Sequence, residues 1–228
     1  FRRVFPHAQM VKIPIADGGE GTVQALVDAE GGITRRIEVL GPQGTPVRAT
    51  YGLARHNSLA MIEMAAASGL ELVPPSDRDP LAATSFGTGQ LILDALDAGA
   101  KHLVIGIGGS ATNDAGAGML QALGVRLLDA HGDPIGRGAA ALQHLARIET
   151  GELDSRLALC HIDVACDVTN PLLGPQGASV IFGPQKGASA AVVQELETCL
   201  QRFADVVQRD LGVDVATIAG SGAAGGLG

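Results

Sequence analysis

The order of apolar and polar positions along the 228-residue chain predicts short strands and helices joined by glycine-rich turns. An apolar run at residues 11–15 ends in a polar turn at residues 17–22, from which apolar residues recur at helical spacing. Residues 33–40 and 47–53 alternate between apolar and polar side chains around a glycine-containing turn, as the two strands of a hairpin do.

The remaining apolar segments extend this alternation along the chain. Short apolar runs predict strands at residues 59–64, 102–107, 125–128, 157–164 and 179–182. Amphipathic spacing predicts helices at residues 84–96 and 192–211, and a shorter helix from Met119 to Gly124. This order of elements is typical of an α/β protein.

Composition narrows the class of protein. Hydrophobic residues make up 46% of the chain and charged residues 18%, which excludes a disordered chain. The formal net charge of −8 argues against nucleic acid as a partner, because phosphate backbones bind basic surfaces. No apolar run approaches the ~20 residues that a membrane helix needs, so we expect no membrane partner.

The cysteines and the two ends of the chain add two expectations. Cys160, Cys166 and Cys199 form no Cys-x-x-Cys pair, which predicts a cytoplasmic protein without a disulfide framework. The chain starts at Phe1 rather than at a methionine and stops within a glycine-rich stretch, residues 220–228. We therefore expect it to be part of a longer protein.

The strongest local signal for function lies between the predicted strand at residues 102–107 and the next helix. The sequence there is Gly106-Ile107-Gly108-Gly109-Ser110-Ala111, followed by Thr112, Asn113 and Asp114. We call residues 106–111 the glycine bend. Glycine lets main-chain amides approach a phosphate closely, and a following helix adds positive partial charge. The polar side chains that follow suit a triphosphate with Mg²⁺.

Two other interpretations of the glycine bend stay open at this point. The bend also fits the G-x-G-x-x-G/A pattern of nicotinamide-dependent oxidoreductases, with Asp129 about 20 residues further on as the ribose-binding acid. Alternatively, the glycines only shape a turn in an interaction module that has no catalytic activity.

A second loop of similar composition places Asp17 and Glu20 on either side of a glycine pair. Two such carboxylates can accept a hydroxyl proton or hold a divalent cation. They can equally cap the helix that follows, since acidic groups near a helix N-terminus stabilise it. Composition alone favours capping.

Two further loops each carry one charged candidate. Asp167 precedes Asn170 and Pro171 and has the chemistry of a metal ligand, although the same pattern forms ordinary turns. Lys186 lies in a glycine-rich loop, where its charge could neutralise a transferring phosphoryl group. The alternative is a solvated loop lysine, which is what most lysines are.

Taken together, these loops resemble the bacterial type-1 glycerate kinase family. The segments that carry the resemblance are residues 16–22, 84–89, 106–118, 167–174, 182–187 and 222–226, in the family's order. They run along essentially the whole chain, and several segments in order are far more specific than a single glycine motif.

The resemblance implies transfer of the γ-phosphoryl group from ATP to D-glycerate with Mg²⁺, giving 2-phosphoglycerate or 3-phosphoglycerate. It also implies two α/β domains, one Rossmann- or flavodoxin-like and discontinuous, the other inserted into it. Residues 1–32 would belong to the first domain and residues 33–228 mostly to the insertion. Glycerate is the expected small-molecule partner, and a homodimer is compatible with the sequence.

Mapped onto this chain, the resemblance implies the following roles. The catalytic residues would be Asp17, Glu20 and Lys186. Phosphate contacts would come from Gly108, Gly109, Ser110, Ala111, Thr112 and Asn113. The metal ligands would be Asp114 and Asp167. Arg35, Arg48 and Arg78 are unranked candidates for binding the carboxylate of glycerate.

The sequence departs from the family pattern at two places. Ala115 stands where the family usually has a glycine. The family's first strand with its Asp-Ser-Phe-Lys segment, and its last stretch with a Gly-Glu-Gly loop, have no counterpart here. The resemblance therefore also implies that this chain is the middle of a longer enzyme.

Overall fold

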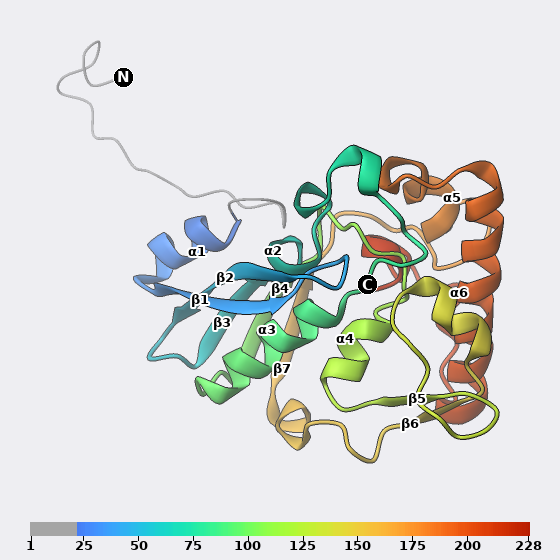
Figure 1. Ribbon diagram of the computed structural model, residues 1–228. Helices are drawn as coiled ribbons and strands as arrows, with labels where there is room; N and C mark the ends of the chain where they lie inside the picture. Colours follow the sequence, from blue (N-terminus) through green and yellow to red (C-terminus); the bar gives the residue numbers. More distant parts are fainter. Residues whose placement is uncertain (1–21) are drawn as a thin grey trace, which may run out of the picture.

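The computed structural model describes residues 22–228, and Figure 1 shows their arrangement. The predicted strand at residues 11–15 and the candidates Asp17 and Glu20 lie outside the described residues. Strands and helices alternate around a mixed sheet, which confirms the predicted α/β class. The division into two domains near residue 32 stays a prediction. Among the described helices, none is both long enough and apolar enough to cross a membrane.

A five-stranded sheet in the order β1-β2-β3-β4-β7 forms one half of the molecule. β1 (Ile33–Leu40) and β2 (Pro46–Ala54) form the predicted hairpin. β3 (Leu59–Glu63) pairs antiparallel with β2, whereas β4 (His102–Gly106) runs parallel to β3, and β7 (His161–Ala165) runs parallel to β4. The carboxyl ends of β3, β4 and β7 therefore meet at one edge of the sheet.

Helices cover both faces of this sheet (Figure 1). α1 (Thr22–Glu30) packs Val23 and Val27 against Met61, while α3 (Phe86–Asp97) joins the core on the other face, which contains Leu103. Side chains alternate between the two faces along each strand, so β3 and β4 contribute apolar residues to both. Between β3 and α3 lies the short helix α2 (Ala65–Ser68).

The other half of the molecule has its own hydrophobic core. It is built from the short helix α4 (Ala117–Ala122), the antiparallel pair β5 (Arg126–Leu128) and β6 (Arg147–Glu149), α5 (Ala178–Phe182) and α6 (Ala190–Leu211). α6 runs along the outer side (Figure 1) and buries Leu196, Leu200, Phe203 and Val207, which recur at helical spacing. Short 3₁₀ helices occupy Leu70–Leu72, Pro75–Asp77, Ala139–His144, Ser155–Leu159, Pro184–Lys186 and Ala223–Gly225.

Two predicted strands differ in the structure. Residues 179–182 belong to the helix α5, where the Ile181 amide donates to the Gly177 carbonyl at 3.1 Å. The run at residues 157–164 is divided between a 3₁₀ turn, Ser155–Leu159, and β7. The predicted strand at residues 125–128 is confirmed as β5, which lies in the separate two-stranded sheet. Short apolar runs fit a strand or a buried helical turn equally well, so the segments that pack against them decide which of the two forms.

Candidate functional site

The carboxyl ends of the three parallel strands bring together residues from distant parts of the sequence. Glu63 ends β3, the glycine bend follows β4, and Asp167 lies two residues beyond β7. A cavity of about 270 Å³ is lined by Gly108, Gly109 and Asp167, and a second of about 280 Å³ by Glu63, Gly108 and Gly109. Ligands of open α/β sheets bind at this edge.

Within the glycine bend, Gly108 and Gly109 are exposed. Gly109 has a φ of 72°, which glycine adopts without strain, and its carbonyl accepts a hydrogen bond from the Leu70 amide at 2.8 Å. Within residues 22–228, the amides of Gly108 and Gly109 have no hydrogen-bond acceptor. This part of the bend therefore offers two main-chain donors to a ligand.

The rest of the predicted phosphate loop lies below the surface. Ser110, Ala111, Thr112 and Asn113 are 7%, 4%, 0% and 0% exposed. The Ala111 amide donates to the Ser68 carbonyl at 2.9 Å, and Asn113 Nδ2 donates to Ser179 Oγ at 3.1 Å. These four residues are buried, unlike Gly108 and Gly109, and their contact with phosphate stays a prediction.

Asp114, a predicted metal ligand, is completely buried. Its carboxylate accepts the Ser85 amide at 2.8 Å, the Ser85 hydroxyl at 2.9 Å, and the amides of Gly116 and Gly118, both at 3.2 Å. Burial raises the pKa of this carboxyl, against the opposing effect of the four hydrogen bonds. These donors occupy both oxygens, so Asp114 ties the start of α3 to the start of α4 instead of facing a metal.

Lys186, on the 3₁₀ turn Pro184–Lys186, is only 1% exposed and donates to the Thr112 carbonyl at 2.6 Å. Burial lowers the pKa of its ammonium group to about 7, and the nearby negative charge of Asp114 limits this effect. It is therefore not a solvated loop lysine. It lines a third cavity, of about 220 Å³, with Arg78 and Ala111.

Asp167 is exposed and lines the same cavity as Gly108 and Gly109, and its role as a metal ligand stays a prediction. The predicted candidates Asp17 and Glu20 lie outside the described residues. α1, which follows them, does begin at this edge, because the Val23 amide donates to Glu63 Oε1 at 2.8 Å.

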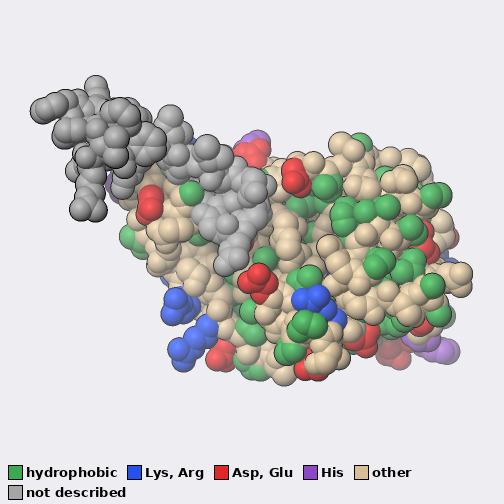
Figure 2. Space-filling view, turned by 90° about the horizontal axis from the view of Figure 1, so that it is seen from above, with side chains coloured by type: hydrophobic (Ala, Val, Ile, Leu, Met, Phe, Trp, Pro, Cys, Tyr) green, Lys and Arg blue, Asp and Glu red, His purple; other side chains and the backbone are tan. Residues whose placement is uncertain are grey.

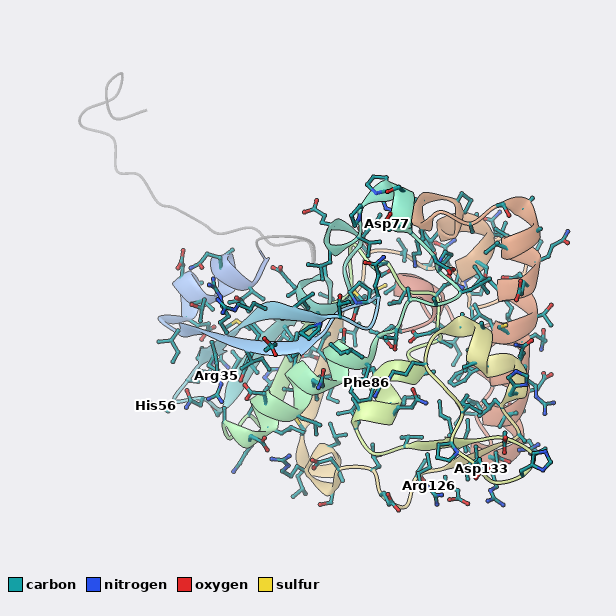
Figure 3. The ribbon with its side chains drawn as sticks, in the orientation of Figure 1. Arg35, His56, Asp77, Phe86, Arg126 and Asp133 are labelled. Atoms are coloured by element: carbon teal, nitrogen blue, oxygen red, sulfur yellow. The ribbon has the colours of Figure 1, made fainter. Side chains whose placement is uncertain are left out.

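Only one of the three arginines named above lines a cavity of this site. Arg35 is paired with Asp94 at 2.7 Å, and Arg48 lies exposed on β2. Figure 3 shows Arg35 on the hairpin, well away from Asp77, the neighbour of Arg78. The structure also adds Glu63, which the sequence analysis missed because it reads as the last polar residue of a buried strand.

The dinucleotide interpretation fails on strand order. It requires the strand that ends at Asp129 to lie beside β4, whereas β5 pairs with β6 in the other sheet. Asp129 Oδ1 instead accepts the amides of His131 and Asp133 at 2.8 and 3.0 Å and shapes a turn.

Lysine and arginine side chains are scattered over the surface. Figure 2 shows Lys and Arg side chains in a few separate groups, with no continuous basic patch on the visible part of that face. The fold and the site together define an α/β protein with an exposed glycine bend at the carboxyl edge of its parallel strands, an arrangement suited to phosphate.

Comparison with known proteins identifies the family. The model of the "Glycerate kinase family" matches residues 1–228, and the chain belongs to that family. It is 57% identical to the glycerate 2-kinase of Escherichia coli K12 and 54% identical to the glycerate kinase of Halalkalibacterium halodurans, over all 228 residues. A solved protein of Salmonella typhimurium LT2, provisionally assigned as glycerate kinase 2, superposes with a TM-score of 0.95 at 58% identity.

The chain spans about 60% of the length of these relatives. It covers 60% of both curated relatives and 62% of the solved chain, while all of its own residues are matched. The predicted family resemblance is thus confirmed.

Proposed function

We propose that the full-length protein transfers the γ-phosphoryl group of ATP to a hydroxyl of D-glycerate. The observation that carries this proposal is the exposed pair Gly108–Gly109, whose amides donate no hydrogen bond to another described residue. Family membership supports glycerate as the acceptor. The name of the Escherichia coli relative, glycerate 2-kinase, favours 2-phosphoglycerate over 3-phosphoglycerate as the product.

In this proposal the Gly108 and Gly109 amides hold phosphate oxygens of the nucleotide. Main-chain donors carry no net charge, and the chain as a whole is acidic, with a formal net charge of −8. Cations close to the site are therefore needed to balance the negative charge of phosphate. Lys186, which is buried and donates to the Thr112 carbonyl, adds a positive charge close to the site when it is protonated. Preorganised donors of this kind stabilise developing negative charge without reorganisation.

Asp167 fits a role in holding Mg²⁺. Asp167 is exposed and lines the cavity that Gly108 and Gly109 line, whereas Asp114 is buried and both of its oxygens accept hydrogen bonds within the fold. Mg²⁺ prefers carboxylate, phosphate and water oxygens, and when bound it neutralises phosphate charge. Asp17 and Glu20 remain our candidates for accepting the proton of the attacking hydroxyl.

Two further expectations belong to the proposal. Cys160, Cys166 and Cys199 are all free thiols, which supports a reducing compartment such as the cytoplasm. A homodimer stays a prediction.

The test is ADP formation from ATP with D-glycerate, catalysed by the full-length protein, with the product identified by ³¹P NMR. We expect 2-phosphoglycerate. Turnover of another hydroxy acid without turnover of glycerate would reject the acceptor, and NADH binding in place of ATP binding would reject the class of reaction.

Gly109→Ala tests the bend itself. A Cβ at Gly109 would have ordinary contact with Ala65 at 3.5 Å, so the substitution strains φ and disturbs the donor without a clash. Gly132→Ala is the matched control: it has a φ of 87° and open space, in a turn far along the chain. Both variants should lose about 1–2 kcal/mol of stability, but only Gly109→Ala should lose activity, by roughly 10²-fold as for one charge-stabilising donor. Equal activity in the two variants would remove the bend from the site.

A further inference from the structure

The cavity of about 220 Å³ beside the glycine bend is separate from the two cavities that Gly108 and Gly109 line. Its wall includes Arg78, Lys186, Ala111 and Leu70, and we call it the Arg78–Lys186 cavity. Leu70 also lines the cavity of about 280 Å³ at the bend, and its amide donates to the Gly109 carbonyl. The two spaces therefore adjoin.

The two cationic side chains that line the Arg78–Lys186 cavity carry N–H groups for which the described residues offer no acceptor. Nε of Arg78 is buried and has no acceptor among the described residues, while Nη1 donates to the Gln185 carbonyl at 3.0 Å and fixes the guanidinium. Lys186 Nζ has three N–H groups but one acceptor within the described chain, Thr112 O. An unpaired buried donor is unfavourable, so Arg78 Nε calls for an acceptor, and Lys186 Nζ can donate further hydrogen bonds.

The two acidic neighbours of Arg78 each accept a hydrogen bond from their own loop. Asp79 Oδ1 accepts the Leu81 amide at 3.0 Å, and Asp77 Oδ1 accepts the Ser76 hydroxyl at 2.7 Å. Asp77 and Asp79 also line the cavity, but both are exposed, whereas Lys186 is buried. Figure 3 labels Asp77 on this turn. Water screens the exposed carboxylates more strongly than the buried cationic group, and this contrast favours a small anion as the ligand.

We propose that the Arg78–Lys186 cavity binds the carboxylate of the acceptor acid, which accepts hydrogen bonds from Arg78 Nε and Lys186 Nζ. This inference rests on the proposed kinase function. Arg78 would then recognise the substrate, and the bound carboxylate would leave a hydroxyl of the same small molecule near the adjoining glycine bend.

Size favours the acceptor over the nucleotide. At about 30 Å³ per water molecule in the liquid, the cavity holds the equivalent of about seven waters, similar to the non-hydrogen atoms of a three-carbon hydroxy acid. A nucleoside triphosphate is several times larger. The wall residues that the structure describes also include no glycine, and the Ala111 amide is already bonded to the Ser68 carbonyl.

The geometry at Arg78 is enforced by its neighbour Gly187. A Cβ at this position would lie 2.8 Å from the Arg78 carbonyl oxygen and 3.0 Å from Arg78 Cβ, and its φ of 95° also favours glycine. The turn that carries Lys186 therefore packs directly on the segment that carries Arg78.

The test compares Arg78→Lys and Arg78→Met with Arg36→Met, an exposed arginine on β1, in the full-length protein. We expect both Arg78 variants to raise KM for D-glycerate about 10- to 100-fold, as loss of one hydrogen bond to a charged group implies, with KM for ATP within threefold of wild type. Arg78→Lys keeps the charge and lacks the Nε donor, so it serves if Arg78→Met folds poorly. Arg36→Met should behave as wild type.

Calorimetric binding of D-glycerate without ATP, with neutral glyceramide as the comparison ligand, separates this inference from the proposed function. Wild-type binding of glycerate that is lost in Arg78→Lys supports the cavity even if no phosphoryl transfer is seen. Unchanged glycerate binding and KM in both Arg78 variants would overturn the cavity while leaving the kinase proposal intact. A rise in KM for ATP alone would assign these donors to nucleotide phosphate and would also overturn the inference.

Discussion

Replacing Lys186 by methionine should change how the stability of the protein depends on pH. The side chain is 1% exposed and its ammonium group has one acceptor, Thr112 O, among the described residues. Burial lowers the pKa of Lys186 from 10.5 to about 7 in the folded protein. Between these values the unfolded state binds more protons than the folded state, so the free energy of unfolding rises with pH across this window.

The size of the effect follows from the width of the window. Each pH unit in which only the unfolded state holds the proton contributes about 1.4 kcal/mol. From pH 7 to pH 9 the wild type should therefore gain about 2–3 kcal/mol of stability from this one group. The gain should be absent in Lys186→Met. Below about pH 7 both states are protonated and the contribution of Lys186 to the slope disappears.

The assay is urea denaturation of the full-length wild type and Lys186→Met at pH 6, 7, 8 and 9. The difference between the two proteins at each pH removes titrations that they share, and Lys101→Met, at an exposed lysine, is the control that should keep the wild-type profile. A wild-type minus Lys186→Met difference that stays constant from pH 7 to pH 9 would refute the reasoning. The buried lysine would then titrate outside this window.

Two other substitutions test the roles of the aspartates. Asp114→Asn replaces one acceptor oxygen by an NH₂ donor, which would face the amides or the hydroxyl that the carboxylate now accepts. It should lower the free energy of unfolding by about 1–3 kcal/mol or more. An unchanged denaturation midpoint would show that the link between α3 and α4 does not depend on this carboxylate. Asp167→Asn should raise the Mg²⁺ concentration for half-maximal activity roughly tenfold, on the view that the carboxylate contributes one charged ligand, without a change in KM for glycerate. An identical Mg²⁺ titration would remove Asp167 from the metal site.

The local pattern of the sequence determined the elements whose partners lie close along the chain. The β1–β2 hairpin, α3 and α6 agree with their predicted ranges within a few residues, because alternation and helical spacing show directly which face each segment buries. The glycine bend was also visible, since φ values such as that of Gly109 favour glycine. Ala115, the departure from the family pattern, has a φ of 53°, where glycine is favoured.

Only the tertiary structure decided which polar groups of these loops remain available. In the sequence, residues 110–113 look as suitable for phosphate as Gly108 and Gly109, but in the structure they are buried and bonded to Ser68 and Ser179. Asp114 looks like a metal ligand in the sequence, whereas in the structure it accepts a hydrogen bond from Ser85, the residue before α3. Arg78 and Lys186 are more than 100 residues apart, and nothing in their local sequence shows that they share one cavity. Sequence spacing reports the conformation of a short segment, but burial depends on what distant segments place above it, and burial determines whether a charge binds a ligand or stabilises the fold.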